Sequence, residues 1–230
     1  MRVYAIGDIH GCSGLLDRMI KAIREDLSTH PARDALTVTL GDYVDRGPDS
    51  RGVLDRLARN PFPTAYLALK GNHEQLLAAF LTDPSVMGHW RQLGAIETLD
   101  SYGVPAGSLM RARDYAQAAA AFRDALPPEH LQFLSQLKLS FDAGSYFLCH
   151  AGIRPGIPFD RQSEEDLLWI REEFLRSRMD FGKVVVHGHT PVDQPEILPN
   201  RINIDTGAFF TGRLTCVALE GASRRFLSMA

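Results

Sequence analysis

Residues that can bind metal or move protons cluster directly after an apolar stretch near the start of the chain. Asp42, Asp45 and Arg46 lie within five positions of one another, just beyond the apolar run at residues 36–40. Carboxylates at the end of a buried strand are costly unless a cation, a metal or a pKa shift compensates for them. Arg46 can neutralise one carboxylate, so the second points to a further positive charge.

The same arrangement recurs four more times along the sequence. The other apolar runs cover residues 1–6, 64–69, 146–149 and 184–186, and they are followed by Asp8 and His10, by Asn72 and His73, by His150, and by His187 and His189. A single Asp or His beside a glycine usually marks a turn. Five such strand ends in one chain are better explained by a shared site, because ligands of α/β sheets bind outside the carboxyl ends of the strands.

The donor set suits a pair of divalent metal ions. Asp42 is the expected bridge, because its strand end lies in the middle of the set and a carboxylate has two oxygens. Asp8 and His10 are two positions apart, so they can point to the same side of an extended segment and complete the shell of one ion. The second ion would be held by Asn72, His150 and His189. Carboxylate, amide and imidazole without thiolate favour Mn, Fe or Zn over Ca or a cysteine-bound structural zinc.

Such a pair of ions supports hydrolysis at phosphorus. Two ions about 3.5 to 4 Å apart lower the pKa of a water held between them, and the resulting hydroxide attacks phosphorus directly. Arg46 supplies a planar fork for the non-bridging phosphate oxygens. His73 is the candidate general acid for the leaving oxygen, and Asp45 is its expected orienting partner.

Other polar residues have less specific interpretations. His187 lies outside a ligand set that is complete without it, so it is expected to support the site or the fold. Asp205 either holds a ligand histidine from outside or makes a simple turn. His30, His89 and His130 lie in polar or helical stretches and are expected to be solvated.

The intervening periodicities predict an α/β chain forming one domain over residues 1–230. Helices are expected at residues 13–27 with Ser13 as cap, from 48 or 49 to about 60, at 72–81, and at 167–178 after a capping box at 163–166. Residues 83–142 read as a helical insert, either a cap that selects substrate or a packing element without a role at the site. Strands are expected at 201–204, 214–219 and 225–227.

Composition and charge exclude several functional classes. The chain carries 25 basic and 28 acidic residues, a net charge of -3, and no long basic run, which argues against a nucleic-acid or membrane surface. The three cysteines are odd in number and favour a reducing compartment. No signal peptide or long apolar span is visible, so a cytoplasmic location is expected. The oligomeric state is not encoded in any pattern we recognise.

The ordered motifs resemble those of the metal-dependent phosphoprotein phosphatase family of metallophosphoesterases. The matching segments are residues 7–11, 41–47, 71–74, 150–152 and 187–190, and residues 168–172 and 204–208 bring the resemblance closest to the small bacterial and phage lambda-type serine/threonine phosphatases. The resemblance implies a calcineurin-like fold, with a central β-sandwich flanked by helices, and a dinuclear centre usually active with manganese. It also implies that Arg171 contacts the phosphate. Lys70 stands where lambda-type enzymes carry an arginine, and it offers a point charge instead of a fork.

We therefore expect a metal-dependent phosphoester hydrolase, first of all a serine/threonine protein phosphatase acting on phosphorylated proteins or peptides. A symmetrical dinucleoside tetraphosphate hydrolase is the main alternative, because relatives with nearly the same signature cleave that anhydride. A catalytically inactive metal-binding scaffold is a third possibility, disfavoured by the complete set of ligands.

Overall fold

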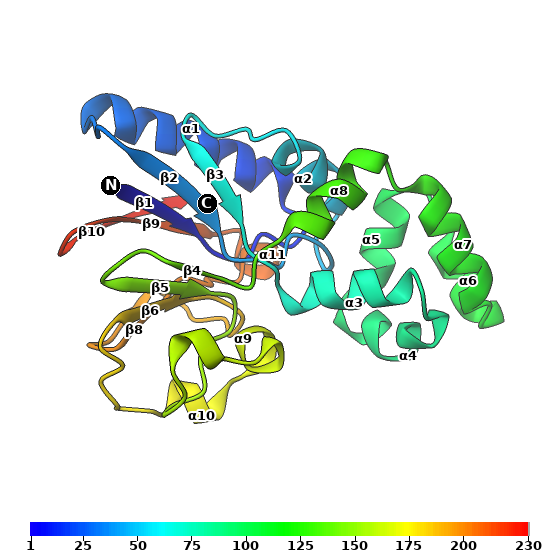
Figure 1. The fold of residues 1–230 in the computed structure, drawn as a ribbon. Coiled ribbons are helices and arrows are strands. Elements are labelled where there is room, and N and C mark those ends of the chain that lie inside the picture. Colours follow the sequence, from blue (N-terminus) through cyan, green and yellow to red (C-terminus); the bar gives the residue numbers. More distant parts are fainter. Residues whose placement is uncertain (230) are drawn as a thin grey trace.

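Two mixed β-sheets pack face to face in the structure, a computed structural model that describes residues 1–229 (Figure 1). The first sheet has the order β10-β9-β1-β2-β3, and the second has the order β4-β5-β6-β8-β7. In the first sheet the strands are β1 (Arg2–Ile6), β2 (Ala35–Thr39), β3 (Ala65–Ala68), β9 (Leu214–Glu220) and β10 (Ser223–Met229). In the second they are β4 (Ser140–Asp142), β5 (Tyr146–Cys149), β6 (Val184–His187), β7 (Glu196–Ile197) and β8 (Arg201–Asn203).

Both sheets have a parallel centre and antiparallel edges. Strands β1, β2 and β3 are parallel, as are β5, β6 and β8, whereas β9, β10, β4 and β7 pair antiparallel with their neighbours. Parallel strands bring their carboxyl ends to one edge of the sheet. The three strand ends with metal-binding residues in the first sheet therefore face the two in the second.

The core between the sheets follows from strand alternation. Val3 and Ala5 of β1 face the second sheet and pack in one cluster with Leu148 and Val186, while Tyr4 points to the opposite side. Both faces of β1 are buried, because helices cover the outer side of the first sheet. The expected β-sandwich flanked by helices is confirmed.

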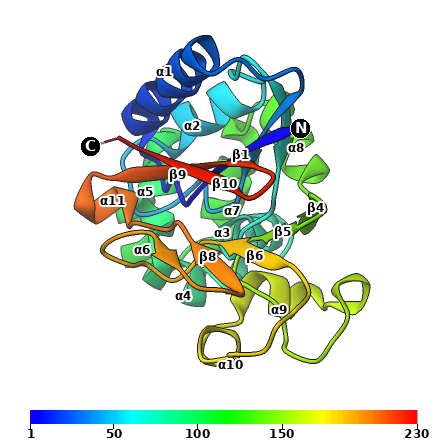
Figure 2. The ribbon, with the colours of Figure 1, turned by 90° about the vertical axis from the view of Figure 1, so that its left-hand side faces the viewer.

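Helices cover the outer face of each sheet (Figures 1 and 2). Helices α1 (Ser13–Thr29) and α2 (Ser50–Leu57) lie on the first sheet; α9 (Glu164–Trp169) and α10 (Glu172–Leu175) lie on the second. The prediction that Ser13 caps α1 is wrong. Its hydroxyl instead donates to Asp49 Oδ2 at 2.6 Å, and Asp49 caps α2 by accepting from the backbone N–H of Gly52. The side chain thus joins two helices.

The middle of the chain forms a helical lobe beside the sandwich (Figure 1). It begins with α3 (Asn72–Phe80) and continues through η1 (Pro84–Val86), α4 (Met87–Trp90), η2 (Arg91–Leu93), α5 (Ala95–Ser101), α6 (Ala106–Ala112), α7 (Tyr115–Ala125) and α8 (Pro128–Gln136). The helical part ends earlier than the expected boundary at 142, because residues 140–142 form β4 and pair with β5.

The predicted helix at 167–178 is wrong, because two short helices replace it. Ile170 adopts an extended conformation with ψ of 140°, which ends α9, and α10 begins two residues later. Arg154 bridges the two helices by bonding Asp166 at 2.6 Å and Glu173 at 2.5 Å. The break places Arg171 between the helices, where its guanidinium donates to Thr190 Oγ1 at 2.9 Å.

The expected solvation of His130 is also wrong. Its side chain is fully buried, with Nδ1 2.7 Å from the Tyr102 hydroxyl and Nε2 3.0 Å from Asp55 Oδ1. These partners are distant in sequence, so helical periodicity gave no sign of them. His30 and His89 are exposed, as expected.

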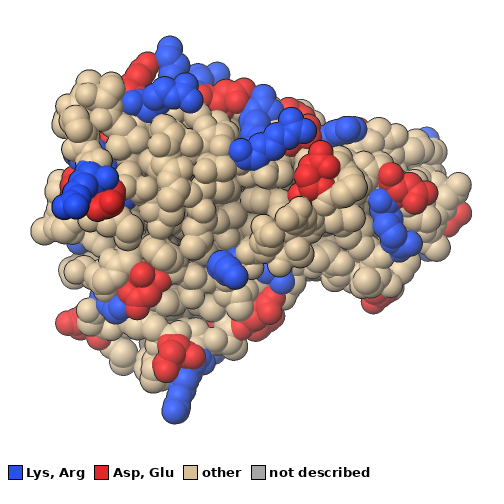
Figure 3. All heavy atoms as spheres, turned by 45° about the horizontal axis from the view of Figure 1, so that its top comes forward, with Lys and Arg blue, Asp and Glu red and all other residues tan. Residues whose placement is uncertain are grey.

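The surface agrees with the near-balanced charge of the sequence. On the face shown in Figure 3, basic and acidic side chains are interspersed, and neither sign forms a continuous stripe. No helix among residues 1–229 combines the length and apolarity that crossing a bilayer requires.

Candidate metal and catalytic centre

The loops after five strands bring the proposed ligands together at the edge where the carboxyl ends of the two sheets meet. His10 and Asp42 follow strands of the first sheet, whereas His150 and His189 follow strands of the second. His10, Asp42 and His189 have positive φ angles of 44°, 53° and 66°. Non-glycine residues in this region cost about 1 to 2 kcal/mol each and persist where the surroundings impose them. The backbone is bent to aim these side chains inward.

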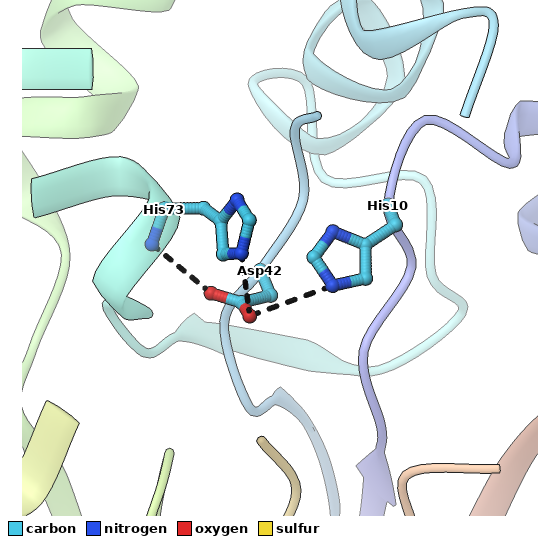
Figure 4. Close-up of side chains that lie close together, drawn as sticks. All are labelled: His10, Asp42 and His73. Atoms are coloured by element: carbon cyan, nitrogen blue, oxygen red, sulfur yellow. Dashed lines mark hydrogen bonds and ion pairs between the residues drawn. The ribbon is translucent and has the colours of Figure 1, made fainter. Parts of the chain in front are cut away.

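Asp42 lies at the centre of the site. One carboxylate oxygen, Oδ2, lies 3.5 Å from His10 Nε2 and 3.7 Å from His73 Nε2 (Figure 4). The other oxygen, Oδ1, lies 3.4 Å from His150 Nε2. The carboxylate therefore faces two imidazoles at Oδ2 and one at Oδ1, an arrangement compatible with the expected bridging role.

The hydrogen bonds of two histidines show that unprotonated imidazole nitrogens face Asp42. His10 Nδ1 lies 2.8 Å from the carbonyl oxygen of Val44, and His150 Nδ1 lies 3.0 Å from that of Leu40. Because a carbonyl oxygen only accepts, each Nδ1 carries the proton, and the neutral ring leaves Nε2 with an exposed lone pair. Both lone pairs point at a carboxylate, an arrangement that a cation would stabilise.

A second group of acceptors surrounds His189. Asn72 Oδ1 lies 2.9 Å from both His150 Nε2 and His189 Nδ1, and these two nitrogens are 3.1 Å apart. Asp8 Oδ1 and His189 Nε2 are buried without a hydrogen-bond partner among residues 1–229. Buried polar atoms of native proteins are rarely left unpaired. The donor atoms of Asp42, His150 and His189 lie within 4.8 Å of one another, so the residues fit a bound metal ion.

The charge states also fit metal binding. Burial lowers the pKa of His10 to about 3 and that of His189 to about 2, and it lowers the pKa of His150 as well. These histidines are therefore neutral near pH 7, as ligands must be. Burial and the nearby Asp205 and Asp42 raise the pKa of Asp8 well above its ordinary value. A divalent cation would relieve this repulsion between carboxylates.

His73 and Asp45 form a buried pair beside the ligands. His73 Nδ1 donates to Asp45 Oδ2 at 2.6 Å, which leaves Nε2 facing Asp42. Burial disfavours the protonated imidazole, but Asp42 and Asp45 outweigh it and raise the pKa of His73. Since His10, Asp42 and His73 also lie close enough to share an ion, geometry allows His73 a ligand role as well. Its carboxylate partner and raised pKa favour a proton donor.

Arg46 lies at the same edge of the site. Its Nη2 is 3.3 Å from His73 Nε2, and its guanidinium carbon lies 5.0 Å from the centre of the Phe209 ring. Phe209 belongs to α11 (Ala208–Thr211), the short helix that directly precedes β9. No pattern in the sequence predicts a role for Phe209, because its contacts with Arg46 and His10 form only in the folded chain.

Glu74 is a second residue whose role the sequence analysis missed. Its carboxylate accepts from the backbone N–H groups of Asp42 at 2.9 Å, Tyr43 at 2.8 Å and Gly71 at 2.9 Å. Burial and the neighbouring Asp42 raise its pKa to about 7. Its position directly after His73 in the motif is the feature of the sequence that could have revealed this role. Glu74 holds the turn that carries Asp42.

The remaining site candidates lie farther out. Arg171 reaches Thr190, the residue after His189, and so lies at the rim. Lys70 Nζ pairs with Glu164 at 2.7 Å, so binding a phosphate would compete with this ion pair. Asp205 accepts from the backbone N–H of Gly207 at 2.9 Å, which agrees with the turn interpretation.

Comparison with known sequences decides the family. Residues 1–209 match the family described as calcineurin-like phosphoesterase. The chain belongs to this family. It is 32% identical over 224 residues to "Serine/threonine-protein phosphatase 1" of Salmonella typhimurium, covering 95% of this chain and 92% of that protein. The chain is therefore a hydrolase of phosphoester bonds, and the resemblance seen in its motifs is confirmed.

Two other relatives of this phosphoesterase are named as dinucleoside tetraphosphatases and not as protein phosphatases. "Bis(5'-nucleosyl)-tetraphosphatase PrpE [asymmetrical]" of Anoxybacillus flavithermus is 28% identical over 231 residues, which cover 92% of this chain and 88% of that protein. "Bis(5'-nucleosyl)-tetraphosphatase, symmetrical" of Methylococcus capsulatus is 37% identical over 155 residues, which cover 67% of this chain and 44% of that protein. Membership of the family therefore does not decide which leaving group this phosphoesterase releases.

Proposed function

We propose that this phosphoesterase removes phosphate from phosphoserine and phosphothreonine in proteins. The single observation that carries the chemistry is the convergence of bare acceptor atoms on Asp42, with the His73–Asp45 pair beside them. The near full-length similarity to a relative named as a serine/threonine phosphatase supports the choice of substrate.

Two divalent ions fit the acceptor atoms described above. Asp8, His10 and Asp42 would hold one ion, and Asp42, Asn72, His150 and His189 would hold the other. When bound, the ions supply a hydroxide nucleophile near neutral pH and neutralise phosphate charge. Manganese is the metal we expect, and iron or zinc would suit the same donors.

The side chains of this protein would orient the phosphate and supply the proton. Arg46 and Arg171 would bind the non-bridging oxygens, because guanidinium groups match phosphate geometry. Lys70 would add a point charge after leaving Glu164. His73 Nε2, held by Asp45 through the opposite nitrogen, would give its proton to the leaving oxygen.

Hydrolysis of dinucleoside tetraphosphates is the second candidate. The names of two relatives support it. So does Trp169, a half-buried indole whose ring centre lies 6.2 Å from that of His189 and which could stack with a nucleobase.

Competition between substrates tests the proposal. Manganese-loaded protein is given a phosphoserine peptide and diadenosine tetraphosphate, and the kcat/KM values are compared. We expect the peptide to be preferred. Preference for the nucleotide would reverse the order, and the products would then separate symmetrical cleavage, giving two ADP, from asymmetrical cleavage, giving ATP and AMP. Folded, metal-loaded protein that hydrolyses neither substrate nor an aryl phosphate would be the inactive scaffold.

We also propose a location for this phosphoesterase. Cys12, Cys149 and Cys216 are free thiols, which supports a reducing compartment such as the cytoplasm.

A further inference from the structure

Asp45, the partner of His73, is held by two side chains from the helical lobe. The indole Nε1 of Trp90 donates to Asp45 Oδ2 at 2.6 Å, the same oxygen that accepts from His73. The hydroxyl of Thr98 donates to the other oxygen, Oδ1, at 2.5 Å. Both carboxylate oxygens of Asp45 therefore have fixed donors, and two of the three donors come from residues 45 and 53 positions away.

The backbone of Asp45 is tied to the same place. Its N–H donates to Thr98 Oγ1 at 2.8 Å and to Ser50 Oγ at 3.0 Å. Because Thr98 uses its own proton on Asp45, the 3.0 Å contact between Ser50 and Thr98 requires Ser50 as donor. Asp45, Ser50 and Thr98 are all fully buried. The φ angle of 72° at Asp45 is thus held by a closed set of hydrogen bonds.

Trp90 is fixed by packing as well as by its hydrogen bond. It is fully buried at the end of α4, with its ring 5.2 Å from Phe80 and 6.2 Å from Phe122. An indole inside an aromatic cluster has little rotational freedom, so its N–H direction is set by the lobe. The position of Asp45 Oδ2 therefore depends on how α3, α4 and α7 pack.

The lobe also approaches the phosphate-binding residue next to Asp45. The N–H of Arg46 donates to the carbonyl oxygen of Gly94 at 3.3 Å, and a Cβ on Gly94 would lie 2.5 Å from that nitrogen. With a φ of 103°, position 94 favours glycine on both counts. The lobe and the loop of Asp45 and Arg46 are in direct contact.

We propose that Trp90 and Thr98 are positioning residues for the His73–Asp45 proton donor, so that the helical lobe is part of the catalytic apparatus. This inference rests on the proposed function and adds to it. A carboxylate with three donors keeps its plane and holds the imidazole in one tautomer, with Nε2 directed at the leaving oxygen. If either lobe donor is removed, Asp45 can rotate and the proton is misdirected.

The test compares Trp90→Phe and Thr98→Val with the parent protein on two phosphate esters. Loss of an orienting partner typically costs about 10- to 100-fold in activity. We expect kcat for phosphoserine peptide to fall by this amount with little change in KM. We expect a much smaller loss with p-nitrophenyl phosphate, whose leaving group needs little protonation. Bound metal, measured by elemental analysis, should stay unchanged.

Two controls separate positioning from general damage. Thr98→Ser keeps the hydroxyl and should retain most of the activity on the peptide. Phe62→Leu changes a buried aromatic side chain that packs against Tyr66 and not against Trp90, so any loss that it causes should be equal on both esters. In metal-free protein, the indole proton resonance of Trp90 should shift upfield in Asp45→Asn. If Trp90→Phe fails to fold, Thr98→Val decides.

The outcomes that overturn the inference are distinct from those that overturn the function. Equal losses on both esters, or no loss, in folded Trp90→Phe and Thr98→Val would refute positioning, provided the parent protein hydrolyses the peptide and His73→Asn does not. A parent protein that is inactive on every phosphoester would instead refute the proposed function. The indole resonance would still report whether the contact with Asp45 exists.

Discussion

At the scale of single residues, the site gathers buried carboxylate oxygens and imidazole lone pairs that need a positive charge beside them. The carboxylate of Asp42 faces imidazole lone pairs from His10 and His150, and Asp8 adds a further buried carboxylate, one of whose oxygens has no hydrogen-bond partner in the part of the chain that the structure describes. Left alone, such a cluster is unfavourable, since buried charges need partners. This unfavourable cluster of buried acceptors lies where bound cations would stabilise it.

Ligand and acid can be separated by two asparagine variants. We expect Asp42→Asn to lose bound metal together with activity, because the bridging charge is removed. His73→Asn should keep its metal and lose about 100- to 10,000-fold in kcat, the usual contribution of a general acid. Elemental analysis beside steady-state kinetics measures both. Comparable metal loss in the two variants would make His73 a ligand.

Phe209 should matter through Arg46. The ring lies under the guanidinium at 5.0 Å and is 38% exposed. A cation–π contact of this kind contributes about 0.5 to 1 kcal/mol at exposed sites, equivalent to about 2- to 5-fold in binding. Phe209→Ala should therefore raise KM by this amount, whereas Phe210→Ala, at a more exposed position, should change it less. Equal effects would point to general packing of α11.

At the scale of elements, the sequence reveals what is local. The strand ends could be predicted because each apolar run and its polar ending are adjacent in the chain. The donors to Asp45 could not, since Trp90 and Thr98 reach it only when the lobe folds against the sandwich. The break between α9 and α10 was missed for the same reason, because Arg154 bridges them from outside the helical pattern.

The contact between α3 and α9 gives a prediction about substrate affinity. Glu164 pairs with Lys70, just before α3, and accepts from Gln75 at 3.5 Å. Surface pairs contribute at most about 1 kcal/mol, so Lys70 can be released at small cost. Glu164→Gln should lower KM for phosphate esters by less than about 5-fold. Glu165→Gln changes the same charge on the same helix and should not; a fall in both variants would indicate a long-range charge effect.

Helix α1 is joined to the first sheet by a buried carboxylate, which gives a prediction about pH and stability. Asp26 accepts from Tyr4 at 2.6 Å and from Arg225 at 2.7 Å. Burial alone would raise the pKa of Asp26, but the hydrogen bonds from Arg225 and Tyr4 outweigh it and hold the pKa below its ordinary value. Asp26→Asn should lower the free energy of unfolding at neutral pH by about 1 to 3 kcal/mol.

The pH dependence has a definite sign. The unfolded chain binds more protons than the folded one between the two pKa values of Asp26, so stability rises with pH there. The contribution is complete above the unfolded value of about 3.9 and is lost as pH falls through the folded value. Denaturant unfolding across this range should show the parent and Asp26→Asn converge in acid. Glu25→Gln, on the exposed side of α1, should differ little from the parent at any pH.

At the scale of the whole molecule, the proposed ions would connect the two sheets. His10, Asp42 and Asn72 follow strands of the first sheet, and His150 and His189 follow strands of the second. A ligand that binds only the folded protein stabilises it by about 2.7 kcal/mol at a concentration 100 times its Kd. Manganese should therefore raise the melting temperature of the parent protein and leave Asp42→Asn nearly unchanged. An equal rise in both would indicate binding elsewhere.

The bent backbone of the site has a consequence for recognising inactive relatives. His10, Asp42, Asp45, Arg46 and His189 hold left-handed conformations that glycine adopts without steric strain. Once the reaction no longer matters, glycine at these positions would relieve both the steric penalty and the crowding of charge. A related sequence with glycine at several of these positions would therefore be an inactive relative that has kept the fold and lost the activity.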